Sequence, residues 1–232
     1  KGKIAPNLKM YLTTPEPNGS VKTLYGGNAK PFEFTTIREA RDFIKRYEGV
    51  SGAELFGQHN FTLQSIYNTY PHELKFDQNK ISSWSLDIET KLPVDEDGRP
   101  SGFPDVETAN AEITLITMQR ISDGATYTFA SREYPDGKPD CNQFINAGSE
   151  SDLLRMFISF WNEQSVEVIT GWNIERFDIP YIINRCNLVC GESVTDQLSP
   201  WGKVSVIKKK ISGSFGDEEL VASISGVSIL DY

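Results

Sequence analysis

Apolar and polar residues alternate through residues 80–89, KISSWSLDIE, and this alternation predicts a half-buried strand. Residues 111–120, AEITLITMQR, and residues 125–130, ATYTFA, also read as strands, and the turn ISDG between them predicts an antiparallel pair. Residues 166–170, VEVIT, form a short apolar run of the kind that lies at the centre of a sheet. The pattern therefore predicts a sheet with both antiparallel and buried central strands.

Two segments of the same region have the period of a helix. Residues 149–164 fit a capping box at Ser149 and Asp152, and one face of this segment carries Leu154, Phe157, Ile158 and Trp161. Residues 178–189, DIPYIINRCNLV, predict a second helix with Pro180 acceptable in its first turn. The order strand, strand, strand, helix, strand, helix predicts a mixed sheet covered by helices, an α/β domain over residues 78–232.

The first 77 residues have a different texture. Turn clusters rich in Pro, Gly and Asn interrupt them, and residues 35–49 predict one helix that Thr35 or Thr36 can cap and Gly49 can end. Its apolar stripe consists of Ile37, Ala40, Phe43, Ile44 and Tyr47. Strand-like pieces surround this helix, so we expect a small α+β amino-terminal domain over residues 1–77.

The end of the chain predicts a two-stranded ribbon followed by one more strand. Residues 203–211 and 219–225 flank the glycine-bearing stretch SGSFGDE, which would form the tip of the ribbon. Residues 226–232, GVSILDY, predict the further strand.

Composition and charge narrow the classes of function. The chain has 232 residues and a net charge of −9, which argues against broad binding to duplex phosphates but allows nucleic acid in a local site where metal ions reverse the field. Three cysteines without a C-x-x-C pair indicate neither a zinc site nor a disulfide framework, and they suit a reducing, cytoplasmic setting. No apolar run is long enough for a membrane span. Because the chain opens Lys1-Gly2-Lys3 without Met, we expect an excised piece of a longer protein.

Three carboxylates carry the candidate chemistry. Asp87 and Glu89 are two positions apart on the predicted strand, so their side chains share one face, roughly 6–7 Å apart. Asp178 begins a predicted helix directly after a strand, a junction where ligands gather in open α/β sheets. Together they would form an oxygen-only cluster that suits Mg²⁺ or Mn²⁺. Two such ions about 4 Å apart can activate water and stabilise the leaving oxygen of a phosphodiester.

The motifs SLDIET and GWNIERFDIPYIINR resemble the Exo I and Exo II motifs, D-I-E and N-x-x-x-F-D-I-P-Y, of family B DNA polymerases. The likeness is greatest to the replicative polymerases of large tailed phages, and REARDFIKRYE, NTYPHELKFDQNKI, GESVTDQLSPWGK and GVSILDY extend it over most of the chain. The resemblance implies a 3′–5′ proofreading exonuclease domain with an RNase H-like fold, preceded by an amino-terminal domain. It also implies that Asp87 bridges two metal ions, Glu89 holds the tighter one, and Asp178 supports the second, partly through water.

The resemblance further implies residues that hold DNA. Asn173 matches the Asn of Exo II, which helps to hold the frayed primer end, and Phe103 resembles an aromatic that stacks on a base there. A loop aromatic packed on the core is the alternative interpretation of Phe103. The ribbon resembles a hairpin that helps to separate primer from template. Its lysines, Lys208, Lys209 and Lys210, would contact phosphate or, alternatively, protect an exposed strand from edge pairing.

Two parts of such a polymerase are missing from these residues. The third exonuclease motif, Y-x-x-x-D, does not occur, so we expect the isolated chain to be nearly inactive as a nuclease, and without the polymerase palm it cannot synthesise DNA. The implied partners are the single-stranded 3′ end of primer DNA, the rest of the polymerase chain and, through that remainder, a sliding clamp. The implied location is the cytoplasm of the phage-infected host cell. The alternative function is a single-stranded nucleic-acid-binding module with vestigial carboxylates.

Overall fold

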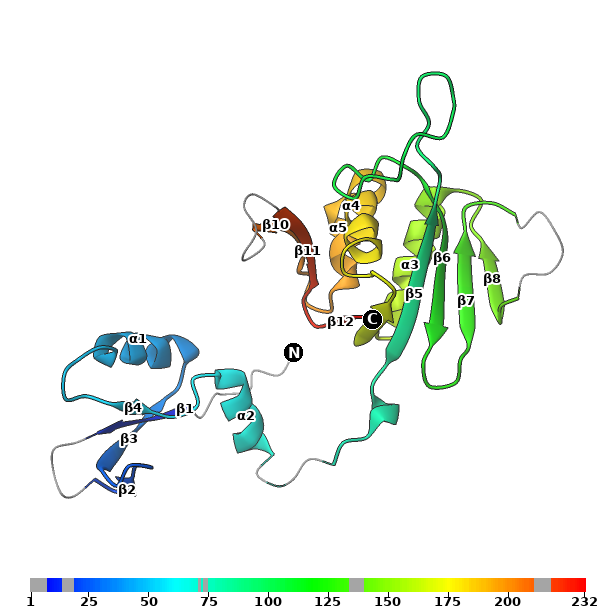
Figure 1. The fold of residues 1–232 in the computed structure, drawn as a ribbon. Helices are drawn as coiled ribbons and strands as arrows, with labels where there is room; N and C mark the ends of the chain where they lie inside the picture. Colours follow the sequence, from blue (N-terminus) through cyan, green and yellow to red (C-terminus); the bar gives the residue numbers. More distant parts are fainter. Residues whose placement is uncertain (1–7, 14–18, 71, 73–74, 134–139, 211–217) are drawn as a thin grey trace. The chain divides into compact units, whose positions relative to one another are not determined.

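The computed structural model describes residues 8–13, 19–70, 72, 75–133, 140–210 and 218–232. The chain divides into two compact units, Lys1–Phe76 and Asp77–Tyr232. Figure 1 shows the strands and helices of each unit along the chain. Each unit has a hydrophobic core of its own.

The first unit combines a small antiparallel sheet with two helices. The order in the sheet is β2-β3-β1-β4, and β1 pairs with both β3 and β4. Leu8, Ala40, Phe43 and Phe61 form the buried cluster. The elements are β1 (Leu8–Thr13), β2 (Val21–Lys22), β3 (Asn28–Phe34), α1 (Ile37–Tyr47), β4 (Leu55–Phe56) and α2 (Phe61–Thr69).

Helix α1 confirms the helix predicted over residues 35–49. Thr36 is the N-cap residue, and its hydroxyl accepts the backbone N–H of Glu39 at 3.2 Å. The predicted apolar stripe is only partly buried: Ala40 and Phe43 lie in the core, whereas Ile37, at the first helical position, is 41% exposed. The periodicity did not predict α2.

The second unit is built on a six-stranded mixed sheet, and this confirms the predicted α/β architecture. Its order is β12-β9-β5-β6-β7-β8, with β5–β6 and β6–β7 antiparallel and the other three pairs parallel. The strands are β5 (Ser83–Thr90), β6 (Ile113–Arg120), β7 (Thr126–Ala130), β8 (Gln143–Asn146), β9 (Val168–Gly171) and β12 (Ser228–Asp231).

Helices cover one face of this sheet. Helix α3 (Glu150–Glu163) packs against β6 and β7, and α4 (Asp178–Cys190) packs against β5 and α3 (Figure 1). The core between the helices and the sheet includes Trp84, Leu86, Ile88, Phe157 and Trp161. One half of the predicted capping box of α3 is present, because Ser149 Oγ accepts the Asp152 N–H at 3.2 Å, and the Ser149 hydroxyl donates to Asp152 Oδ2 at 2.7 Å. The apolar face predicted for this helix is buried.

The ribbon predicted near the end of the chain consists of β10 (Val204–Lys210) and β11 (Glu218–Ile224), which pair antiparallel. Its predicted tip lies outside the described residues except for Glu218. The predicted last strand is β12, which runs parallel to β9 at the edge of the sheet. Within the described part of the chain, no helix is long and apolar enough to cross a bilayer.

Three details differ from the sequence prediction. The strand predicted from residue 80 begins at Ser83, because Gln78–Lys80 forms a 3₁₀ turn (η1) that Asp77 caps. The edge strand β8 was not predicted, since its four residues, QFIN, are too few to establish a pattern. The short helices α5 (Glu192–Thr195) and η2 (Asp196–Leu198) were also missed, because neither is longer than about one turn.

Candidate active site

Strand β5 places Asp87 and Glu89 on the open face of the sheet. The side chains of Leu86 and Ile88 point into the core, and Asp87 and Glu89, which alternate with them, are exposed. Thr117 of β6 pairs with Asp87, and Leu115 pairs with Glu89. The two carboxylates therefore stand on a surface that the core helices do not cover.

Asp178 is the buried carboxylate of the site. It is the first residue of α4, it is only 4% exposed, and its Oδ1 accepts the backbone N–H of Ile88 at 3.1 Å. The carboxylate thus reaches from α4 to the strand that carries Asp87. Gly171 at the end of β9 permits close strand packing there, because a Cβ at this position would lie 2.6 Å from the carbonyl oxygen of Leu86.

The electrostatics of Asp178 are unfavourable to its charge. Burial is the largest cause that raises its pKa, followed by the nearby charge of Asp87, and the result is a value of about 6. The hydrogen bond from the Ile88 N–H acts in the opposite direction and stabilises the carboxylate. The charges of Asp178 and Asp87 are thus close enough to interact, and Asp178 is buried whereas Asp87 is exposed.

Asp231 is a further acidic residue near this point, and the sequence interpretation did not select it. It lies at the end of β12, in register with Gly171, and its charge also raises the pKa of Asp178. Its proximity depends on β12 docking next to β9 in the sheet. No spacing along the chain reveals that order.

The donor set fits a hard divalent cation in its chemistry. Asp87, Glu89 and Asp178 offer only oxygen atoms, and a cation between Asp87 and Asp178 would relieve the repulsion between them. Over the residues that the structure describes, no three His, Cys, Asp or Glu side chains converge closely enough to hold an ion. Of the three predicted ligands, Asp87 and Asp178 therefore lie close to each other, whereas Glu89 is exposed on β5, the strand that also carries Asp87.

Asn173 lies in the turn from β9 into α4. Its φ of 55° is left-handed, a conformation that Asn tolerates better than most residues, and its carbonyl accepts the N–H groups of Arg176 and Phe177. The neighbouring Trp172 is 75% exposed, and the sequence interpretation did not select it. Both residues are presented to solvent at the end of the strand that precedes Asp178.

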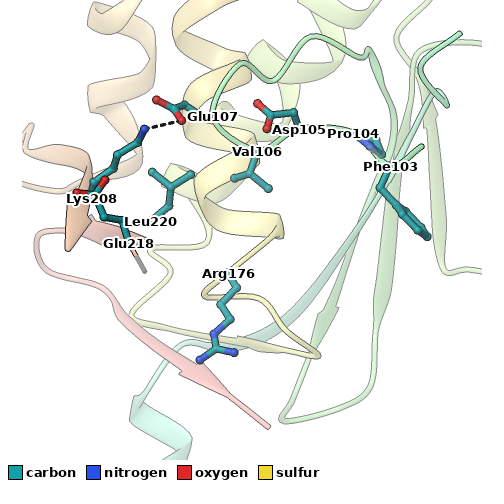
Figure 2. Close-up of a pocket in the computed structure, with 9 residues that line it drawn as sticks. All are labelled: Phe103, Pro104, Asp105, Val106, Glu107, Arg176, Lys208, Glu218 and Leu220. Atoms are coloured by element: carbon teal, nitrogen blue, oxygen red, sulfur yellow. Dashed lines mark ion pairs between the residues drawn. The ribbon is translucent and has the colours of Figure 1, made fainter. Parts of the chain in front are cut away.

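A cavity of about 660 Å³ lies between the loop before β6, the β9–α4 turn and the ribbon. Figure 2 shows Phe103 on the loop, Arg176 on the turn and Lys208 on the ribbon among its lining residues. Phe103 is 92% exposed, so its ring does not pack on the core. The alternative interpretation of this aromatic is therefore wrong.

The three ribbon lysines have different surroundings. Lys208 Nζ forms an ion pair with Glu107 Oε2 at 2.7 Å, the dashed line in Figure 2, and this hydrogen bond is the main reason that the pKa of Lys208 is raised. Lys209 is exposed, and its position in the ribbon pairs with Glu219. The side chain of Lys210 lies outside the described part of the chain. Contact of these lysines with DNA stays a prediction.

Comparisons with known proteins agree with the motifs. The family described as DNA polymerase family B, exonuclease domain, matches residues 59–232. The chain is 32% identical over 235 residues to the DNA-directed DNA polymerase of Enterobacteria phage T4 and 31% identical over 233 residues to that of Escherichia phage RB69. These alignments cover 91% and 90% of this chain and 25% of each phage protein.

A shorter part of the chain is similar to a herpesvirus protein. Over 48 residues, 21% of this chain, it is 42% identical to the DNA polymerase catalytic subunit of Saimiriine herpesvirus 2 (strain 11). The chain spans about a quarter of the length of the two phage relatives. The six-stranded mixed sheet with flanking helices is consistent with the RNase H-like exonuclease fold of this family. Because the family match covers most of the chain, the chain belongs to DNA polymerase family B, whose exonuclease domain residues 59–232 represent.

Proposed function

We propose that this chain is the 3′–5′ proofreading exonuclease region of a replicative DNA polymerase, preceded by an amino-terminal domain over residues 1–77. The observation that carries the proposal is the buried carboxylate of Asp178 held next to Asp87, which keeps two like charges together where a divalent cation would stabilise both. Exonuclease domains of this family are in general metal-dependent nucleases. The substrate is the 3′-terminal phosphodiester of a single-stranded primer end.

The proposed roles are those that the resemblance to family B polymerases implies for these residues. Asp87, Glu89 and Asp178 would hold two ions, Mg²⁺ or Mn²⁺, which when bound supply an activated water and stabilise the leaving oxygen. Asn173 and Phe103 hold the primer end, with Phe103 offering an exposed ring on which a base can stack. Lys208, Lys209 and Lys210 contribute positive charge along the strand, Lys208 after release from Glu107.

Completing the reaction requires groups that these 232 residues do not contain. The motif Y-x-x-x-D does not occur in them, so we propose that this chain alone cleaves DNA much more slowly than the longer polymerase to which it belongs. That parent would synthesise DNA through its own palm, bind a sliding clamp and act in the cytoplasm of an infected host cell. The phage relatives support this placement.

The test is degradation of 3′ ends in labelled single-stranded DNA with Mn²⁺. We would compare this chain with one extended by about a hundred residues of its parent. Asp87→Ala is made in both chains, and Asp140→Ala, at an exposed aspartate of the same unit, serves as the control in both. Cleavage by the extended chain that Asp87→Ala abolishes and Asp140→Ala retains is the expected result. Absence of cleavage in both chain lengths would contradict the catalytic proposal.

A second candidate function is a single-stranded nucleic-acid-binding module with vestigial carboxylates. The exposed rings of Phe103 and Trp172 favour it, because aromatic surfaces bind bases without any catalysis. The melting temperature separates the two functions. A rise with Mn²⁺ that Asp87→Ala removes supports the nuclease, whereas an affinity for single strands that changes neither with metal nor with loss of the carboxylates supports the module.

A further inference from the structure

The loop that carries Phe103 is fastened to one side of α4. Asn184 Nδ2 donates to the carbonyl oxygen of Val106 at 2.8 Å, and Tyr181 Oη donates to the carbonyl oxygen of Ala111 at 2.7 Å. The same hydroxyl accepts the Ala111 N–H at 3.1 Å. The contacts therefore lie near both ends of the segment between Val106 and Ala111.

Arg185 makes the central contact with the loop. Its Nη1 donates to the carbonyl oxygen of Ala109 at 3.0 Å, and its Nε and Nη2 form a bidentate pair with Glu150 at 2.7 and 2.6 Å. Glu150 in turn accepts the Ile113 N–H at 2.7 Å, at the start of β6. Tyr181, Asn184 and Arg185 have the spacing i, i+3, i+4, which places three neighbouring side chains on one helix face.

The backbone of the loop is held in a conformation that it would not adopt freely. Ala109 has a φ of 43°, in the left-handed region that costs a residue with a Cβ about 1–2 kcal/mol. Asp105 closes the preceding turn by accepting the N–H and the hydroxyl of Thr108 at 2.7 and 2.8 Å. A strained residue persists where its surroundings determine its conformation, so the contacts from α4 preorganise this loop.

We propose that Tyr181, Asn184 and Arg185 are positioning residues that fix Phe103 relative to the Asp178 carboxylate. The inference rests on the function proposed above, in which Phe103 stacks on a base at the 3′ end and Asp178 serves the cleavage of the same end. Helix α4 carries Asp178 at its first residue and, along one flank, all three side chains that hold the loop. A single rigid element thereby sets the distance between the stacked base and the reacting phosphodiester.

The ribbon is attached to the same loop. Lys208 on β10 pairs with Glu107, the neighbour of the Val106 that Asn184 holds, and the cavity lies between these elements. In Figure 2 the ring of Phe103 points away from this ion pair. The loop therefore presents Phe103 while its backbone and its Glu107 side chain are held elsewhere.

The test compares Asn184→Ala with Asn187→Ala, an exposed asparagine three residues further along α4. Hydrogen exchange of residues 103–111 is measured without DNA, and only Asn184→Ala should accelerate it. Binding of a fluorescent oligothymidylate is measured by anisotropy in the presence of Mg²⁺. The last linkage of the oligonucleotide is a phosphorothioate, because this modification slows cleavage during the measurement. We expect Asn184→Ala to weaken binding about three- to tenfold, as loss of one hydrogen bond implies.

A double-mutant cycle with Phe103→Ala shows whether Asn184 acts through the ring. Phe103→Ala should weaken binding about five- to 150-fold, the range for loss of one stacked base. Adding Asn184→Ala to it should then change little, and the rise in melting temperature with Mn²⁺ should persist in Asn184→Ala. Tyr181→Phe, which keeps the buried ring, serves as the milder variant if Asn184→Ala does not fold.

The outcomes separate this inference from the proposed function. Unchanged exchange of the loop in both variants overturns the anchoring by α4. Faster exchange with unchanged binding, or an equal loss of binding with and without Phe103, overturns the positioning role. If the wild-type chain binds no oligothymidylate, the proposed function fails and the positioning role fails with it, whereas the exchange result still reports the anchoring itself.

Discussion

Asp178→Asn is predicted to stabilise the second unit in the absence of divalent metal. The carboxylate is 4% exposed, and burial together with Asp87 raises its pKa from 3.8 to about 6. Asparagine has the same shape and keeps an oxygen that can accept the Ile88 N–H. The substitution therefore removes the buried charge without opening a cavity or leaving that N–H unpaired.

The sign and size of the effect follow from the pKa. Because the folded chain holds the proton of Asp178 more tightly than the unfolded chain, this group lowers the free energy of unfolding as pH rises from about 3.8 to about 6. Below that window both states are protonated and the group contributes nothing. Above it the loss is complete, about 3 kcal/mol at about 1.4 kcal/mol per pKa unit. We expect Asp178→Asn to exceed the wild type by about 2–3 kcal/mol at pH 7.5 and to match it near pH 4.

Urea unfolding in EDTA, followed by tryptophan fluorescence, measures the difference in the free energy of unfolding of the second unit between Asp178→Asn and the wild type. All four tryptophans, at positions 84, 161, 172 and 201, belong to the second unit. Other carboxylates titrate over the same range, so the informative quantity is the difference between variant and wild type at each pH. Asp140→Asn, at an exposed position of the same unit, is the matched control.

Two results would refute the reasoning about Asp178. One is an Asp178→Asn variant that is less stable than the wild type at pH 7.5 in EDTA. The other is a stability difference that does not grow between pH 4 and pH 7.5, because a buried carboxylate must produce that slope. Addition of Mn²⁺ supplies a further check, since metal should stabilise the wild type and narrow the advantage of the variant.

The remaining predictions concern packing and reactivity in the second unit. Arg185→Met should lower the free energy of unfolding by about 3–5 kcal/mol in urea, because it leaves the Glu150 carboxylate, whose side chain is only 11% exposed, without its cation; a loss below about 1 kcal/mol would contradict this. Gly171→Ala should lower the melting temperature, with a cost of about 1–3 kcal/mol, since its Cβ would meet a backbone oxygen of β5; an unchanged temperature would show that β9 can shift freely. Burial raises the pKa of Cys186, so iodoacetamide at pH 8 should modify the other two cysteines first by mass spectrometry, and equal labelling of all three would refute it.

The sequence was sufficient for the elements whose residues alternate or repeat over enough positions. The alternation around Asp87 and Glu89 predicted a strand with both carboxylates on one face, and the period of residues 149–164 predicted α3 and its buried side. These predictions succeed because local patterning and burial agree there. The four-residue strand β8 offers too few positions for such agreement, so its place at the sheet edge had no signal.

Contacts between distant segments could not be predicted from spacing. Asp231 approaches Asp178 only because β12 pairs with β9, and Lys208 finds Glu107 only because the ribbon and the loop flank one cavity. The loop that carries Phe103 is likewise held by a residue far away in the sequence, because Asn184 of α4 donates a hydrogen bond to the carbonyl oxygen of Val106. Each of these facts requires the order of the strands and the docking of α4, which no local period encodes.

The motif F-D-I-P-Y gains a physical interpretation from α4. Asp178 turns to β5, whereas Ile179 and Pro180 are buried in the first turn. Tyr181 is fully buried, its ring stacks on Phe177 at 5.4 Å between centroids, and its hydroxyl holds the loop at Ala111. Five consecutive residues thus place one carboxylate at the strand and fasten the loop that carries Phe103. One extra residue between Asp178 and Tyr181 would rotate one side chain relative to the other around the helix axis. We therefore expect such an insertion to disrupt both the contact of Asp178 with β5 and the contact of Tyr181 with Ala111, even if helix α4 still forms.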